Sequence, residues 1–475
     1  MQREKALLKN MVVLGFGTVF PKIASLITLP LITAYLTVEE YGIYDLILTI
    51  ASLFLPVATL QMQAAAFRFL VGVRDNIHEQ KKIISNILSF TIITTVLALA
   101  VLFICMNNIE IKLKLLVVIY YFLDIIVITF RQIARGLSKN TIYSISVITN
   151  SFGELLLVVV LLWCMHAGIV GALLALIISL AISAVFISVK LKLFSLFEFN
   201  LVSKKILKEL ISYSWPMIPN SLSSWVMSLS DRLVLTAMLG VSANAIYAVA
   251  NKLPNLFGIV QSSFNLAWQE NASVSVDDMD SSKYYGKMFS AVFKMLIGFM
   301  GILIGCAPIL FLLLIRGDYD SAYIHISILF MAALFSSMSS YLGGIYVAHK
   351  KTKEIGITTT VSAILNVLID LLLVKKIGIF AASLSTVISY LILVVFRMHD
   401  VQRIQKIKFD YKLVALGVSL LTGMCFICSV RNRYLNIANF IFGIAIAIIF
   451  NKDLIGRVLQ KVKQRMDVFS SKGRS

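Results

Sequence analysis

Charged side chains inside long apolar stretches are the residues of this chain with the clearest chemical potential. Five of them are the cations Lys22, Arg68, Arg232, Lys252 and Lys294, of which we expect Lys294 to lie at the membrane interface. A charge at membrane depth costs about 2.5–3.5 kcal/mol on insertion scales, so such residues usually mark substrate or ion pathways. We therefore predict that Lys22, Arg68, Arg232 and Lys252 line such a pathway. The alternatives are ion pairs with carboxylates and, for Arg68 near a helix end, snorkelling to the surface.

The carboxylates in this unusual environment include Asp124, Glu154, Asp231 and Asp370. A carboxylate in an apolar environment binds protons more readily than one in water. We predict that these residues carry a coupling proton or sodium ion. The competing interpretation is that each one hydrogen-bonds a neighbouring helix.

The elements that position these side chains are long apolar segments. The chain is 59% hydrophobic and 14% charged, whereas soluble domains are about 45–50% apolar and 25% charged. A transmembrane helix needs about 20 apolar residues, and by that length the sequence predicts an all-α polytopic membrane protein. Fourteen spans are expected, at residues 11–36, 43–71, 83–105, 113–134, 141–163, 167–189, 209–238, 243–271, 289–313, 322–348, 355–374, 378–397, 413–431 and 434–450.

Most lysine and arginine residues outside the predicted spans fall in segments on one side of the membrane, and they outnumber those on the other side roughly four to one. The basic side includes the N-terminus, the 190–208 segment and the tail after residue 451. By the positive-inside rule, both termini are predicted to be cytoplasmic. The net charge of +19 therefore indicates topology and contact with anionic lipids, and we expect no nucleic-acid partner.

The chain also repeats itself at an offset of about 203–216 residues. The segment 168–186 matches 378–396, NSFGELLL at 150–157 matches NVLIDLLL at 366–373, and LTVEEYGIY at 36–44 matches LGVSANAIY at 239–247. The second match makes Glu154 and Asp370 counterparts. Such offsets predict two six-helix lobes in parallel pseudo-repeat around a central cavity. We expect an N-lobe at 1–200, a C-lobe at 201–400, two extra helices at 401–450 and a basic cytoplasmic tail at 451–475.

The prolines follow the same division. Six of the seven fall in the first helix pair of one half or the other, among them Pro216 and Pro219. Proline bends or breaks a helix because it lacks the backbone donor and crowds the preceding turn. These pairs are therefore the expected moving elements of an alternating-access transporter.

Two stretches resemble a known family. LTVEEYGIY at 36–44 follows a proline-bearing first helix, and SYSWPMIPNSLSSWVMSLSDRLVL at 212–235 ends in Ser230-Asp231-Arg232. Both are similar to polysaccharide flippases, the O-antigen and capsule (Wzx-type) branch of the multidrug/oligosaccharidyl-lipid/polysaccharide exporter superfamily. The resemblance implies a bacterial inner-membrane protein that moves an undecaprenyl-pyrophosphate-linked oligosaccharide from the cytoplasmic to the outer leaflet. It also implies membrane lipids and polysaccharide assembly proteins as partners.

With the cargo that the resemblance implies, Lys22, Arg68, Arg232 and Lys252 become candidates for charge-assisted hydrogen bonds to the pyrophosphate. Three tryptophans become candidates for stacking on sugar rings: Trp215, Trp225 and Trp268. Translocation needs no covalent chemistry, so we expect no catalytic residue, no metal and no cofactor beyond the coupling ion. The Cys425/Cys428 pair has no second pair or nearby histidine, and we interpret both as core residues.

Three other functions remain open. A cation-coupled multidrug exporter and a peptidoglycan-precursor flippase belong to the same superfamily. A membrane glycosyltransferase or polymerase is more remote, because the longest segments between spans are about 20 residues and the chain has no P-loop.

Overall fold

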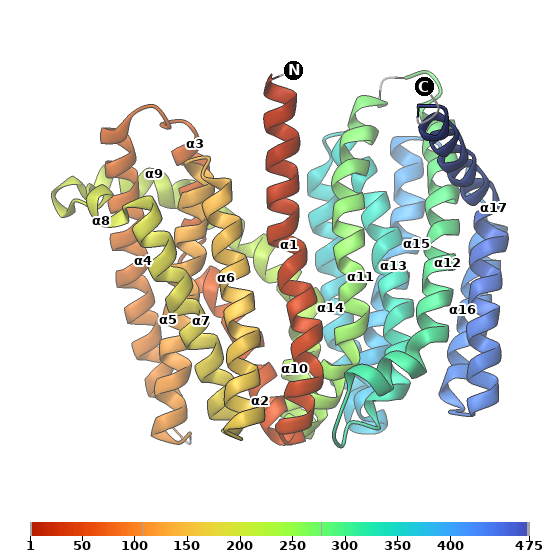
Figure 1. The fold of residues 1–475 in the computed structure, drawn as a ribbon, viewed down its shortest axis with the longest axis horizontal. Coiled ribbons are helices and arrows are strands. Elements are labelled where there is room, and N and C mark those ends of the chain that lie inside the picture. Colours follow the sequence, from red (N-terminus) through yellow and green to blue (C-terminus); the bar gives the residue numbers. More distant parts are fainter. Residues whose placement is uncertain (1, 108, 277, 473–475) are drawn as a thin grey trace. The chain divides into compact units, whose positions relative to one another are not determined.

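The regular structure of the chain is helical throughout the part that the structure describes (Figure 1). The computed structural model describes the backbone of residues 2–107, 109–276 and 278–472, and most side chains between residues 19 and 456. The α-helices are Gln2–Tyr35 (α1), Val38–Ala58 (α2), Met62–Val71 (α3), Ile77–Cys105 (α4), Ile111–Gly136 (α5), Asn140–Val158 (α6), Gly168–Leu191 (α7), Leu193–Leu196 (α8), Lys204–Ser214 (α9), Ile218–Leu239 (α10), Val241–Val274 (α11), Ser281–Leu314 (α12), Ala322–Ala348 (α13), Thr352–Ile377 (α14), Ile379–Ile404 (α15), Tyr411–Ser429 (α16) and Arg433–Lys472 (α17).

The predicted all-α membrane architecture is confirmed. Among the described residues, eleven helical segments are long and apolar enough to cross a bilayer. They correspond to eleven of the fourteen predicted spans, and the remaining three fall on α1, α10 and α11. The count of fourteen therefore stays a prediction. α10 and α11 carry the charged and amide side chains discussed below, which lowers their hydropathy.

The chain forms two compact units. The first comprises residues 1–248 with the short segment Leu314–Tyr319, and the second comprises Val249–Leu313 with residues 320–475. The division into lobes at residues 200 and 400 was predicted from the internal repeat, and it stays a prediction.

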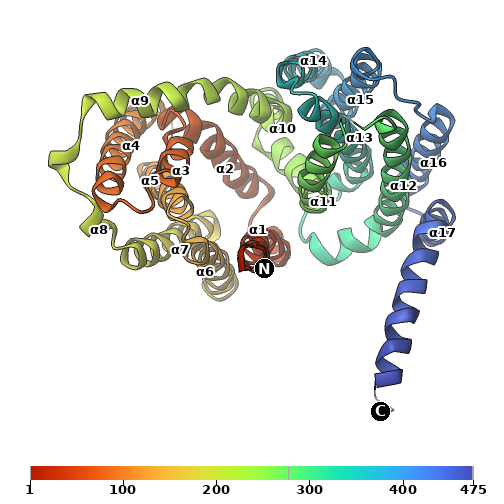
Figure 2. The same cartoon turned by 90° about the horizontal axis from the view of Figure 1, so that it is seen from above.

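The core of the first unit joins α3, α4, α5, α7 and the amphipathic helix α9. Leu210 of α9 is fully buried against this core, whereas Lys204, Lys205 and Lys208 of the same helix are exposed. Seen along the long helices, α9 lies crosswise over α3 and α4 (Figure 2). A crosswise amphipathic helix with lysines on its outer face is typical of a membrane–water interface.

Two predicted spans are interrupted. The span at 43–71 breaks between α2 and α3, where Leu60 and Gln61 adopt left-handed backbone angles (φ 46° and 59°). The span at 209–238 breaks at the 3₁₀ turn Trp215–Met217, so that Pro216 lies in the turn and Pro219 lies in the first turn of α10. Proline is well tolerated in a first turn because the backbone donor it lacks would be unpaired there. These prolines therefore start a helix where the sequence predicts a bend within one.

The second unit contains the rest of α11 and α12 to α17. Gly443 of α17 lies directly against the backbone of Gly301 on α12, where a Cβ atom would overlap the Gly301 carbonyl group. α17 is kinked at Asn451, whose backbone angles (φ −113°, ψ 15°) are not helical. The candidate span Arg433–Lys452 ends at this kink.

Candidate functional site

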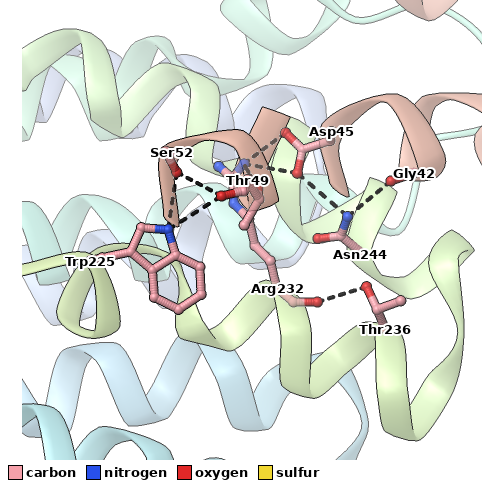
Figure 3. Close-up of polar contacts among 8 residues, drawn as sticks. All are labelled: Gly42, Asp45, Thr49, Ser52, Trp225, Arg232, Thr236 and Asn244. Carbon is pink, nitrogen blue, oxygen red and sulfur yellow. Dashed lines mark hydrogen bonds and ion pairs between the residues drawn. The ribbon is translucent and has the colours of Figure 1, made fainter. Parts of the chain in front are cut away.

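An ion pair between Asp45 of α2 and Arg232 of α10 forms the centre of the site (Figure 3). Nη1 of Arg232 lies 2.7 Å from Oδ1 and 2.8 Å from Oδ2 of Asp45, and 3.2 Å from the Thr49 hydroxyl. Asp45 is 1% exposed and Arg232 is 9% exposed. Two charges so completely removed from water are stable only as a hydrogen-bonded pair.

The start of α11 completes the site. The side-chain amide of Asn244 donates to the Gly42 carbonyl (3.2 Å) and to Oδ2 of Asp45 (3.4 Å). The hydroxyl of Tyr247 donates to the Asp231 carboxylate at 2.5 Å. Three helices are thus joined by buried polar contacts, and the two adjacent charges Asp231 and Arg232 have different partners.

Trp225, one turn and a half before Asp231 on α10, extends this network. Its indole N–H lies 3.0 Å from the Ser52 hydroxyl and 3.3 Å from the Thr49 carbonyl, both on α2. Trp225 is buried, and it fastens α10 to α2 in this conformation. Its predicted role in glycan stacking stays a prediction.

The EEYG segment explains how α2 reaches this position. Thr37 and Glu40 form a reciprocal capping box at the start of α2, and Glu40 also accepts from the backbone N–H of Ile169 (3.2 Å) at the start of α7. Tyr41 is buried against the Tyr319 ring, with the centroids 5.8 Å apart. Gly42 has no room for a side chain, because a Cβ atom there would overlap the Val241 carbonyl oxygen. The segment therefore sets the distance between α2 and α11.

Lys22 differs from Arg232. It is partly exposed, and it forms no hydrogen bond or ion pair with the described part of the chain. It follows Pro21, which lines a cavity of about 180 Å³ between α1, α5 and α6. Arg131, Asn150 and Glu154 contribute polar groups to the same cavity.

The repeat counterparts Glu154 and Asp370 lie in different environments. Glu154 lines the small cavity, with the hydroxyls of Ser25, Thr28 and Ser151 among its neighbours there. Asp370 is fully buried and accepts a 2.6 Å hydrogen bond from Ser385, which in turn accepts from Asn366. Their equivalence in sequence therefore does not extend to solvent access. Asp124 interacts electrostatically with Arg131, two helical turns along α5.

The remaining predicted residues are dispersed. Arg68 is exposed on α3, Trp215 is 56% exposed in its 3₁₀ turn, and Lys252 is partly exposed on α11. Trp268 is 2% exposed, stacks on Tyr341 with the ring centroids 4.2 Å apart, and donates to the Tyr341 carbonyl (2.8 Å). In this conformation its ring is covered by protein.

Asp45 is the residue of the site that sequence reasoning missed. A signal was available, because a buried Arg232 requires a countercharge and Asp45 lies three residues after the glycine of the EEYG segment. Arg397 was missed for another reason: it is the last residue of the predicted span 378–397 and was counted with the basic residues of the cytoplasmic side, although it is 4% exposed within α15. Its guanidinium donates to Thr358, Thr359 and the Ser339 carbonyl at 2.8–3.1 Å.

Among the described residues, no group of three or more histidine, cysteine, aspartate or glutamate side chains is placed to hold a metal ion. Cys425 and Cys428 lie on α16, where Cys428 is buried beside the Tyr323 hydroxyl at 3.3 Å.

Solved structures with the same fold are transporters. A lipid II flippase MurJ in an inward closed conformation aligns with a TM-score of 0.69 and 17% identity, over 92% of this chain and 98% of that one. An inward-facing multidrug resistance MATE family transporter aligns with a TM-score of 0.63 and 14% identity, over 84% and 99%. A MOP superfamily transporter from Pyrococcus furiosus aligns with a TM-score of 0.55 and 16% identity, over 84% of this chain and 96% of that one. At these identities the likeness establishes the fold.

The sequence itself identifies the family. No curated protein matches the chain significantly. The family model described as polysaccharide biosynthesis protein matches residues 7–272, which is more than half of the chain and includes both the EEYG and the Ser-Asp-Arg segments. The chain is therefore a multi-pass membrane protein that belongs to the polysaccharide biosynthesis protein family.

Proposed function

We propose that this protein is a flippase that moves a pyrophosphate-linked lipid oligosaccharide from the cytoplasmic to the outer leaflet of the bacterial inner membrane by alternating access. The observation that carries the proposal is Lys22. It is a cation near the middle of a membrane-depth helix that no described residue neutralises, whereas Arg232 is neutralised by Asp45. A pyrophosphate needs such a partner, because its charges would otherwise be desolvated.

The Asp45–Arg232 pair supplies the conformational part of the proposal. It joins α2, from the first helix pair of the first sequence half, to α10, from the first helix pair of the second half. The contact lies near the α1–α2 and α10–α11 loops. By the positive-inside rule those loops are on the outer side. We propose that the pair acts as an outer gate, which must open for the cargo to leave.

Ion coupling is proposed for Glu154. A carboxylate that lines a polar cavity of about 180 Å³ can exchange a proton or a sodium ion without unfolding its surroundings. Oxygen ligands are the ones that hard cations prefer, and the cavity offers carboxylate, amide and hydroxyl oxygens. Assembly proteins for surface polysaccharide are the expected partners.

The first experiment is deletion of the gene in its host, followed by analysis of lipid-linked glycan and surface polymer. Loss of surface polymer with accumulation of lipid-linked repeat units on the cytoplasmic face supports the flippase. Intact polymer with new sensitivity to cationic drugs would contradict it and favour a multidrug exporter. Loss of cell-wall precursor transport would favour a peptidoglycan-precursor flippase.

The Lys22→Gln variant then tests the carrying observation in the complemented strain. We expect surface polymer to be lost while the protein amount in the membrane is unchanged. The matched control is Lys376→Gln, since Lys376 is an exposed lysine at the end of α14. Equal polymer from both variants would remove Lys22 from the cargo site.

A further inference from the structure

A pocket of about 880 Å³ lies within the second compact unit, and none of its lining residues belongs to the site described above. Five lysines line it: Lys283, Lys287, Lys294, Lys406 and Lys408. Asp280 is the single acid among its described lining residues. The lining therefore carries an excess of four positive charges, which repel one another unless an anion is bound.

Three of the lysines form a stripe on α12. Residues 283, 287 and 294 follow one another at intervals of four and seven, a spacing that places side chains on one face of a helix. Ser290 lies on the same face and also lines the pocket. The stripe thus offers ammonium groups with a hydroxyl between them.

The other two lysines come from the loop between α15 and α16, which is held in one conformation. Lys406 and Lys408 are exposed, and they alternate with the buried residues Ile407 and Phe409. The Phe409 ring packs edge-on against Phe289 of α12, with the centroids 4.8 Å apart. A non-helical segment anchored through its buried residues in this way leaves both lysines exposed on its other side.

Polar contacts hold the same loop against α12. Gln402 closes it through the backbone of Ile407, donating to the carbonyl at 2.7 Å and accepting from the N–H at 2.9 Å. The Ser282 hydroxyl donates to the Lys406 carbonyl. Gly286 permits the close approach, because a Cβ atom there would lie 2.7 Å from the Lys408 carbonyl oxygen. The pocket is therefore preorganised by contacts within the protein.

The third wall is the kink of α17. The Asn451 amide donates to the Lys294 carbonyl (3.1 Å) and to the Ala447 carbonyl (3.0 Å), which fixes the kink against α12. Phe450 and Leu454 add apolar surface to the pocket. Beyond the kink, α17 runs crosswise to the long helices and away from α16 (Figure 2).

Three membrane spans end at the level of this pocket. The candidate spans Ser281–Leu314, Ile379–Ile404 and Arg433–Lys452 each have one end beside it. The pocket therefore lies where helices leave the hydrocarbon, and it combines cationic walls with an apolar border. Basic pockets between helices at a membrane surface recognise phosphate-bearing lipid headgroups.

We infer that this pocket binds the phosphate-bearing headgroup of an anionic lipid. The phosphate oxygens contact the lysines of α12 and of the α15–α16 loop, and the acyl or prenyl chain passes along Phe450 and Leu454 into the bilayer. Two lipids carry this chemistry, a resident phospholipid and a polyprenyl pyrophosphate. The inference does not depend on the proposed transport function, because binding is measured without transport.

The test uses the full-length protein in nanodiscs of phosphatidylcholine alone, with added phosphatidylglycerol, with added polyprenyl pyrophosphate, or with soluble pyrophosphate in the buffer. The midpoint of thermal unfolding and the number of lipids retained in native mass spectrometry are measured. The pocket variants are Lys283→Gln with Lys287→Gln, and Lys406→Gln with Lys408→Gln. The matched control is Lys375→Gln with Lys376→Gln, which removes two exposed lysines at the end of α14.

We expect an anionic lipid to raise the unfolding midpoint of the wild type and of the control. Each pocket variant should bind that lipid about 25-fold more weakly, because a lysine near an anionic surface contributes about a factor of five. Its midpoint in phosphatidylcholine alone should not fall, which shows that the variant folds.

The lipid whose binding is weakened in the pocket variants identifies the ligand. Weaker binding of phosphatidylglycerol indicates a resident phospholipid, and weaker binding of polyprenyl pyrophosphate alone indicates the cargo lipid. An equal response of wild type, pocket variants and control to every lipid overturns the inference. Stabilisation by soluble pyrophosphate, as strong as that by either lipid, overturns it as well, because the lipid chain would then contribute nothing.

Discussion

Asp45 and Arg232, 187 residues apart in the sequence, form a buried ion pair with a shortest N–O distance of 2.7 Å. The pair brings together α2 and α10, the helices that carry the EEYG and the Ser-Asp-Arg segments. Asp45 directly follows the 36–44 stretch and Arg232 lies within the 212–235 stretch, so the pair connects the two stretches by which the chain resembles its family.

The first prediction concerns this pair. Asp45→Asn leaves Arg232 charged and buried without a carboxylate, so the free energy of unfolding should fall by about 3–5 kcal/mol. Thermal unfolding in detergent checks the change. The exchanged pair, Asp45→Arg with Arg232→Asp, should recover part of that loss and part of the surface polymer. An exchanged pair no more stable than either single variant would show that the contact is not an ion pair.

The second prediction concerns the contact of α2 with α11. Gly42→Ala places a methyl group against the Val241 carbonyl oxygen, so the helices must separate, at a cost of about 1–3 kcal/mol. Gly423→Ala on α16 is the control, because nothing lies within 4 Å of its Cβ position. Thermal unfolding of both variants gives the comparison, and equal midpoints would contradict the close approach.

The third prediction separates the two repeat carboxylates. Glu154→Gln should keep the fold and lose the dependence of transport on pH or sodium, since Glu154 lines a cavity. Asp370→Asn should instead lower stability by about 1–3 kcal/mol, because Asp370 is buried and accepts from Ser385. Transport in vesicles at varied pH and sodium, with unfolding measured in parallel, distinguishes the two. Unchanged ion dependence of Glu154→Gln would exclude it as the coupling residue.

The fourth prediction concerns Arg397. A lysine in its place keeps the charge but cannot reach Thr358, Thr359 and the Ser339 carbonyl together, so unfolding should become easier by about 2 kcal/mol. Arg403→Lys is the control on the same helix, because the Arg403 side chain is 75% exposed and its contact with Asp400 is 3.8 Å long. The prediction fails if both variants unfold at the same temperature as the wild type.

Several features of this protein follow from the sequence alone, because they depend on local composition. Apolar runs of about 20 residues are sufficient to predict the helices and the membrane, since backbone groups in hydrocarbon must be satisfied within the helix. The EEYG and Ser-Asp-Arg segments were sufficient to identify the family. Arg232 and Asp231 were recognisable as functional candidates because charges in such runs are costly.

Only the tertiary structure decided how those charges are paired. Asp45 and Arg232 are distant in the sequence, and no spacing rule connects residues of two different helices. The same limit applies to Glu154 and Asp370, which match in the repeat but differ in solvent access because their neighbours differ. The lysine pocket is a further example: its lysines lie in two segments more than a hundred residues apart, and packing at Gly286, Phe409 and Asn451 brings them together.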